Sequence, residues 1–129
     1  MDLNVVHEIL FNAHTLFSMA LGIWAVAMAA RGESISGNFW GAVATYAILA
    51  GMVLLVGIIM LLTGLRPPRL TLYILYMLWL VGIMPGLFTL LRGRDDRSAA
   101  IAFGILAFFN ASVSASMAQR MVVGPWLPG

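Results

Sequence analysis

Charged residues in this chain are confined to short clusters, and the long uncharged runs between them constrain the fold more than any other feature. Four segments of 22, 32, 22 and 22 residues contain no Asp, Glu, Lys or Arg, and they are residues 9–30, 34–65, 70–91 and 98–119. At a rise of about 1.5 Å per helical residue, each segment is long enough to cross the hydrocarbon core of a bilayer, which is about 30 Å thick. The spacing of charges therefore predicts four membrane-spanning helices.

The composition excludes a water-soluble globular domain. The 129 residues are 62% apolar and only 9% charged, and the mean hydropathy is +0.99. A soluble domain of this size needs a polar surface that is larger than its core, and this chain cannot supply one. We therefore expect one all-α integral membrane domain over residues 1–129.

Turn-forming and helix-capping residues divide the chain into four helices. Pro67 and Pro68 resist a helix interior, and Asp96 is suited to capping the last helix. Sequential helices joined by short loops must be neighbours, which favours an up-down antiparallel four-helix bundle with short loops. The expected helices cover approximately residues 4–30, 38–64, 70–91 and 98–122.

The basic residues are divided almost equally between the two sides of the membrane, so they indicate the orientation of the helices less directly than the uncharged runs indicate their number. All seven are arginines, and the predicted topology places four of them on one side of the membrane and three on the other. Arg31, the only basic residue that flanks the first helix, favours both termini on the outer side. We expect a prokaryotic inner (cytoplasmic) membrane location, with the lipid bilayer and other membrane subunits as partners. No basic patch for nucleic acid is present.

Small residues recur at four-residue spacing in the second, third and fourth predicted helices. In lipid, small residues allow helix backbones to approach closely. Because the last helix carries them on more than one face, we expect it to have more than one close neighbour, either within the bundle or in another protein. The predicted helix-packing residues are Gly37, Gly41, Gly82, Gly86, Gly104, Ala107, Ala111, Ser112, Ala115 and Ser116.

His7 and His14 are the only histidines, and they share one face of the first helix about 10.5 Å apart along its axis. Two side chains on one helix cannot reach opposite sides of a haem, which excludes a bis-histidine haem within one copy. A His–Met haem and a chlorophyll-type magnesium with a single axial histidine both stay open for His14. The alternative is structural: His14 bonds a backbone carbonyl or Asn110, and His7 lies at the membrane interface beside Asn4 and Glu8.

The first helix also resembles the loose pattern of quinone-binding helices, in which an aliphatic residue precedes a histidine that is followed by Leu, Thr or Ser. Leu10-x3-His14-x3-Ser18 and Leu3-x3-His7-x2-Leu10 both fit this pattern. The resemblance implies that a neutral imidazole donates a hydrogen bond to a quinone carbonyl. Haem, quinone and a chlorophyll-type pigment are thus the candidate cofactors, although the simpler expectation is that this chain alone binds none. The candidate cofactor-binding residues are His14, His7, Ser18 and Trp24.

Four further polar side chains lie within the predicted spans. They indicate either a hydrophilic path or hydrogen bonds between helices, and such bonds contribute about 0.6 kcal/mol each on average. Polar groups at membrane depth are expected to face protein or ligand rather than lipid. These polar intramembrane residues are Asn12, Asn110, Ser114 and Gln119.

Several activities are excluded by what the spans lack. There is no cysteine, no Ser-His-Asp set, no His-x-x-x-His pair and no paired carboxylate, so neither catalysis nor a metal site is predicted. Small multidrug resistance transporters are similar in size and helix number, but their proton coupling depends on a glutamate within the first helix, where this chain has only Glu8 at the edge. We expect a non-catalytic accessory subunit of a respiratory or photosynthetic electron-transfer complex. A small homo-oligomeric channel or carrier is the alternative.

Overall fold

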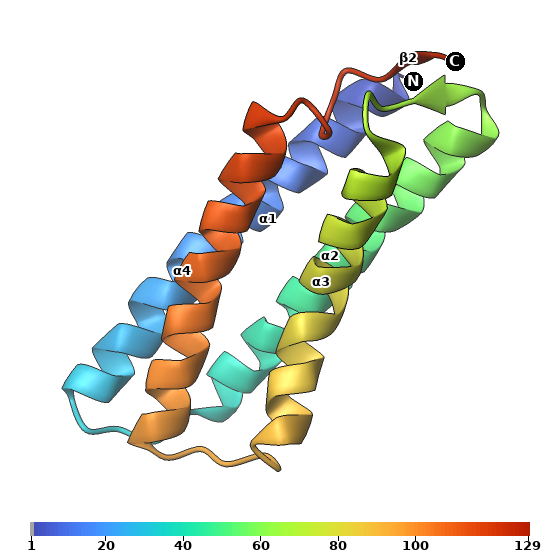
Figure 1. The fold of residues 1–129 in the computed structure, drawn as a ribbon. Coiled ribbons are helices and arrows are strands. Elements are labelled where there is room, and N and C mark those ends of the chain that lie inside the picture. Colours follow the sequence, from blue (N-terminus) through green and yellow to red (C-terminus); the bar gives the residue numbers. More distant parts are fainter. Residues whose placement is uncertain (1) are drawn as a thin grey trace.

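The computed structural model describes residues 2–129, and it is all-helical apart from two very short strands. Each of its four helices is long and apolar enough to cross a membrane, which confirms the predicted number and type of elements. Every predicted helix end lies within three residues of the observed one. The helices are α1 (Leu3–Ala30), α2 (Gly37–Leu62), α3 (Leu70–Leu90) and α4 (Arg97–Gln119) (Figure 1).

Side-chain caps start three of the helices. Asp2, Ser36 and Asp96 precede α1, α2 and α4, and each side chain accepts a hydrogen bond from a backbone N–H two or three residues further on. These bonds satisfy donors that the first turn of a helix leaves free. Helix α3 has no side-chain cap and begins directly after the Pro67–Pro68 turn and Arg69.

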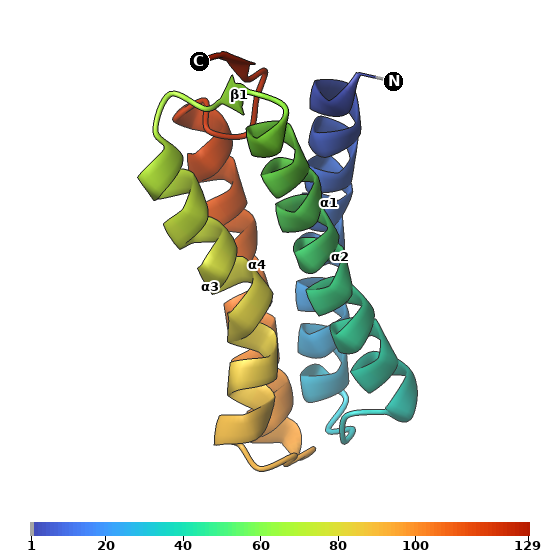
Figure 2. The same cartoon turned by 90° about the vertical axis from the view of Figure 1, so that its right-hand side faces the viewer.

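The connections alternate between the two ends of the molecule. Figures 1 and 2 show the 31–36 and 91–96 connections at one end, and the 63–69 connection with both chain termini at the other. Helix α1 packs against α2 and α4, α2 packs against α3, and α3 makes a smaller interface with α4. The interior is filled by large side chains, including Leu21, Phe39, Tyr46, Leu80 and Phe103.

A short two-stranded sheet closes the end that carries the termini, and sequence analysis did not predict it. Strand β1 (Leu65–Arg66) pairs antiparallel with β2 (Leu127–Pro128). This pairing holds residues 120–129, which we call the C-terminal tail, across the end of the bundle (Figure 2). Val122 and Trp126 of the tail are at most 1% exposed, so the tail contributes to the core.

The prediction of helix-packing residues is only partly correct. Gly104 and Ala107 are buried, and a Cβ atom added at Gly104 would lie 3.3 Å from the Cβ of Ala25 in α1. Of the other residues predicted on α4, Ala111 and Ser116 are partly buried, whereas Ser112 and Ala115 are exposed, so their role in packing against another protein stays a prediction.

The four glycines predicted in α2 and α3 do not pack closely against another helix of this chain, and their role in packing against another protein stays a prediction. Gly37, Gly41, Gly82 and Gly86 all have open space where a Cβ atom would lie. Four-residue spacing occurs on every face of a helix, so it does not identify the buried face. Gly57, which was not predicted, is the close-contact glycine of α2, because a Cβ atom there would overlap the side chain of Tyr73.

Candidate functional site

Five polar side chains are almost fully buried by the other residues of this chain, before any contact with lipid is considered. Two tyrosines and one tryptophan accompany them, and these eight residues form two groups at different depths. The end cluster consists of His7, Tyr73 and Trp126, and the central layer consists of His14, Ser18, Tyr46, Asn110 and Ser114, all at most 1% exposed. The predicted intramembrane residues Asn12 and Gln119 instead lie exposed on the outer surface, so the expectation that they face protein or ligand is not met within this chain and stays a prediction for a partner.

In the end cluster, both ring nitrogens of His7 have partners. The Nδ1 atom lies 2.9 Å from the backbone oxygen of Val123, and Nε2 lies 2.7 Å from the Tyr73 hydroxyl. A carbonyl oxygen can only accept, so Nδ1 carries the proton and Nε2 accepts a hydrogen bond from Tyr73. His7 is therefore buried and bonded to Tyr73 and Val123, and not to its predicted neighbours Asn4 and Glu8. Its real partners are 66 and 116 residues away, which local spacing could not reveal.

Trp126 covers the end cluster. Its ring lies 5.2 Å from His7 and 4.8 Å from Tyr73, measured between ring centroids. The amide of Asn4 holds the backbone of Trp126 through two hydrogen bonds, since Oδ1 accepts from the N–H at 2.8 Å and Nδ2 donates to the carbonyl at 3.1 Å. The start of α1 and the C-terminal tail are thus fastened together above His7.

In the central layer, His14 stacks on Tyr46 with ring centroids 4.1 Å apart and an interplanar angle of 16°. The Tyr46 hydroxyl bonds Ser18 Oγ, and Ser18 Oγ donates to the backbone oxygen of His14 at 3.1 Å. The Nε2 atom of His14, however, has no hydrogen-bond partner. The predicted bond from His14 to a carbonyl or to Asn110 is therefore wrong, and aromatic stacking holds the ring instead.

Helix α4 brings Asn110 and Ser114 to the depth of Ser18 and His14. Gly104 of α4 lies against Ala25 of α1, and the two helices run in opposite directions (Figure 1). Residues after Gly104 in α4 therefore lie opposite residues before Ala25 in α1. Asn110 Oδ1 accepts a 3.0 Å hydrogen bond from Trp79 Nε1 of α3, whereas Asn110 Nδ2 and Ser114 Oγ have no partner. All four helices thus supply a polar group to this layer.

Trp24, the remaining predicted cofactor residue, takes part in aromatic packing. It is partly buried, and its ring meets Phe39 of α2 edge-on at a centroid distance of 5.3 Å and an angle of 85°. It packs against the core that includes Phe39, Phe103 and Tyr46, and it lies ten residues from His14, which is about 15 Å along α1. The structure therefore does not bring Trp24 and His14 together as one binding site.

The chemical range of the buried groups is narrow. The central layer contains an imidazole, an amide and three hydroxyls but no carboxylate. Within residues 2–129, no three His, Asp or Glu side chains gather closely enough to hold a metal ion. Four surface grooves on this part of the chain, the largest about 670 Å³, are lined by neither histidine.

Charges at the end formed by the 31–36 and 91–96 connections are paired with one another. Arg31 contacts Glu33, and Arg94 contacts Asp96, each at 2.7 Å. The hydrogen bond from Arg94, followed by the one from the Ala99 N–H, lowers the pKa of the Asp96 carboxyl below its usual value. Asp96 therefore stays ionised as the cap of α4, where a negative charge is favourable.

Comparison of the chain with protein families, with curated proteins and with solved structures gives no match. The inference of function therefore rests on the contacts and surfaces of this chain.

Proposed function

We propose that this chain is a non-catalytic accessory subunit of a larger energy-transducing membrane complex that carries out electron transfer. Its four helices insert as an up-down antiparallel bundle into a prokaryotic inner membrane, with both termini on the outer side. In support, the helices expose large apolar side chains such as Ile9, Leu16, Ile48 and Leu75 along their length. Such a surface suits hydrocarbon and not water.

The observation that carries the proposal is the outer surface between α2 and α3. A groove of about 380 Å³ runs between these helices and is lined by residues that include Ala44, Ala47 and Pro85. Gly41 and Gly82 lie on the same helix faces, one turn from Ala44 and Pro85, with open space above both glycines. Small residues on a lipid-facing surface allow the backbone of another membrane helix to approach closely. We assign this groove as the docking surface for a partner subunit.

The interior supports a structural role over a coupled transporter. Its buried polar groups include no carboxylate, whereas the proton-coupled exporters of similar size depend on a glutamate within the membrane that exchanges protons with the substrate. The burial of the histidines also bears on where a cofactor of the complex would contact this chain. Because His14 is only 1% exposed, a quinone, haem or pigment of the complex contacts the outer surface and not the His14 imidazole.

A homo-oligomeric channel is the second candidate, and one feature of α4 favours it. Ser112, Ala115 and Gln119 are exposed on one side of the second half of this helix. When several copies associate through this side, the three residues line a polar path. This candidate predicts a stable homo-oligomer without other polypeptides.

The test is gentle extraction from the native membrane, followed by a native gel and a reduced-minus-oxidised absorption spectrum of the protein band. We expect a large assembly with other polypeptides and a haem or pigment spectrum. Ala44→Leu fills the α2–α3 groove and should release the chain from the assembly. Ala20→Leu makes the same change on the exposed face of α1 and should leave the assembly intact. A colourless oligomer of this chain alone would contradict the proposal and favour the channel.

A further inference from the structure

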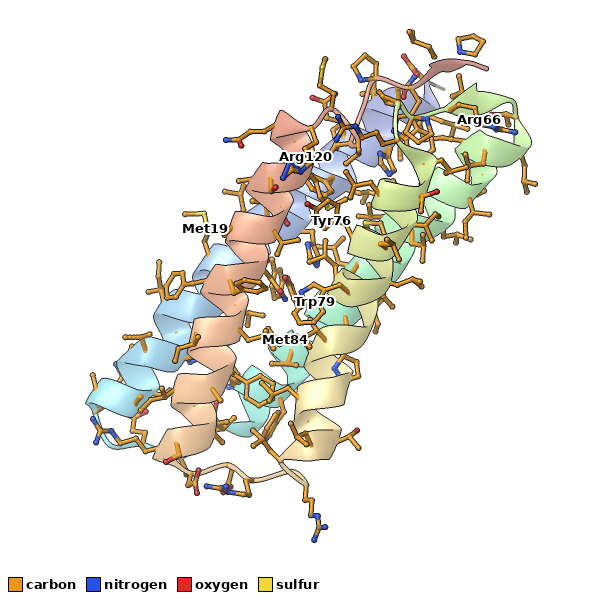
Figure 3. The ribbon with its side chains drawn as sticks, viewed as in Figure 1. Met19, Arg66, Tyr76, Trp79, Met84 and Arg120 are labelled. Carbon is orange, nitrogen blue, oxygen red and sulfur yellow. The ribbon has the colours of Figure 1, made fainter. Side chains whose placement is uncertain are left out.

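A second groove follows the small interface between α3 and α4. It consists of two adjoining hollows of about 670 and 200 Å³, which share Trp79 and Phe109. On α3 the lining runs from Tyr76 to Leu90, and Gly86 leaves space in its floor. Figure 3 shows Tyr76 and Trp79 following one another down the α3 side of the space that faces α4.

The length of this groove matches a lipid tail. Tyr76 and Leu90 are 14 residues apart, which is about 21 Å along a helix. One leaflet contributes about half of the 30 Å hydrocarbon core, so an acyl chain from one leaflet fits within the groove. Its lining is apolar apart from the Tyr76 hydroxyl and the Trp79 N–H, and the latter is already donated to Asn110.

An arginine is bonded to the lining at one end of the groove. Arg120 Nε donates a 3.3 Å hydrogen bond to the Tyr76 hydroxyl, and Figure 3 shows Arg120 above Tyr76 between the two helices. The guanidinium has further N–H donors that this bond does not use. At the opposite end, the 91–96 connection carries charges of both signs, Arg92 and Arg94 with Asp95 and Asp96, and Arg94 is paired with Asp96. The contact between Arg120 and the groove lining therefore favours a ligand with an anionic head at this end.

We propose that the α3–α4 groove binds one anionic phospholipid, with its phosphate at Arg120 and one acyl chain along Trp79 and Phe109. Arginine suits this position because its planar fork matches phosphate oxygens. The Tyr76 hydroxyl orients the guanidinium and lies at the depth where the lipid headgroup joins its acyl chains. This site is separate from the α2–α3 docking groove, so its failure would leave the subunit proposal unaffected.

Trp79 supplies the readout, because it lines both hollows and is 40% exposed. The protein is reconstituted into vesicles that contain brominated phosphatidylglycerol or brominated phosphatidylcholine, whose bromine atoms quench tryptophan fluorescence on contact. The contribution of Trp79 is the quenching that disappears in Trp79→Phe. We expect this contribution to show an apparent affinity about fivefold higher for phosphatidylglycerol, as one arginine near an anionic lipid provides.

Two matched variants and one blocking variant complete the test. Arg120→Gln should bring the affinity ratio close to one, whereas Arg66→Gln, which removes the same charge at the same end, should leave it unchanged. Gly86→Leu fills the groove and should reduce Trp79 quenching by both lipids, and far-UV circular dichroism verifies that each variant is helical. A ratio near one in the unmodified protein, or a ratio that survives Arg120→Gln, would overturn the proposal. Absence of Trp79-dependent quenching would also overturn it, because a partner helix or second copy would then cover the groove.

Discussion

Replacing Tyr73 with phenylalanine removes one oxygen atom from the end cluster and tests whether His7 is held as the structure indicates. Tyr73 is 0% exposed, and its hydroxyl is the donor to His7 Nε2. The imidazole cannot adjust by moving its proton to Nε2, because Nδ1 would then place a lone pair against the Val123 oxygen 2.9 Å away. Tyr73→Phe therefore leaves a buried acceptor without a donor.

The size of the effect follows from two contributions. Hydrogen bonds between membrane helices are worth about 0.6 kcal/mol on average and about 1.7 kcal/mol at most. A buried acceptor that loses its partner costs about 1–3 kcal/mol. Because His7 lies beneath Trp126, away from both water and lipid, we expect the free energy of unfolding to fall by about 1.5 kcal/mol, near the upper end of the first range.

Gly57 provides an internal control for the position of the hydroxyl. A Cβ atom at Gly57 would overlap the Tyr73 hydroxyl and lie 3.0 Å from Tyr73 Cζ. Gly57→Ala should therefore destabilise the protein by about 1–3 kcal/mol through overpacking. When it is combined with Tyr73→Phe, the cost should be smaller by at least about 0.5 kcal/mol, because the overlapping oxygen is gone.

The assay is unfolding in mixed micelles as the fraction of sodium dodecyl sulfate rises, followed by far-UV circular dichroism and by tryptophan fluorescence. Trp126 contacts Tyr73, so the fluorescence reports on the end cluster. An unchanged midpoint for Tyr73→Phe would refute the buried His7–Tyr73 bond. An equal cost of Gly57→Ala in both backgrounds would refute the contact between Gly57 and the hydroxyl.

Three further outcomes are expected from the same unfolding assay and from proteolysis. His14→Phe keeps the stacking on Tyr46 and removes an unpartnered nitrogen, so it should be neutral or stabilising, whereas His14→Ala should cost about 2 kcal/mol or more; equal losses would show that the imidazole has a polar partner. Asp96→Ala should destabilise the protein through loss of the cap. Because the carboxylate pKa is lowered by Arg94, this cap stabilises the protein above about pH 4 and is lost as the pH falls further, so the difference between the two proteins should disappear in acid. Trp126→Ala should accelerate removal of the C-terminal tail by a protease, and an unchanged digestion rate would contradict the role of this ring in holding the tail.

The helices could be predicted from the sequence because their signals are local. An uncharged run has the length of its own helix, and Asp96 bonds an N–H only three residues further on. The membrane environment strengthens such signals, since a backbone in hydrocarbon must satisfy its own hydrogen bonds. Each boundary therefore depends on residues within a few positions of it.

The end cluster could not be predicted because its contacts join distant segments. His7 is satisfied by Tyr73 on α3 and by Val123 in the tail, and neither residue carries a signal that points to a histidine. The only available cue was that His7 and His14 share a helix face. Both are indeed buried on that face, but one is bonded and the other is stacked, and spacing does not distinguish the two.

Some small residues lie on the outside of the bundle and some bulky aromatic residues lie inside it, and this distribution bears on the proposed role. In a bundle that functions alone, the smallest residues are best used between its own helices, yet Gly41 and Gly82 lie on the outside with open space above them. Bulky rings occupy the interior instead, where Tyr46 stacks on His14 and Tyr73 reaches Gly57. A helix in lipid gains nothing from an exposed glycine, which lowers helix propensity by about 1 kcal/mol relative to alanine. That cost is offset when another helix packs against the glycine, and a helix of the proposed partner subunit in the α2–α3 groove would provide this contact.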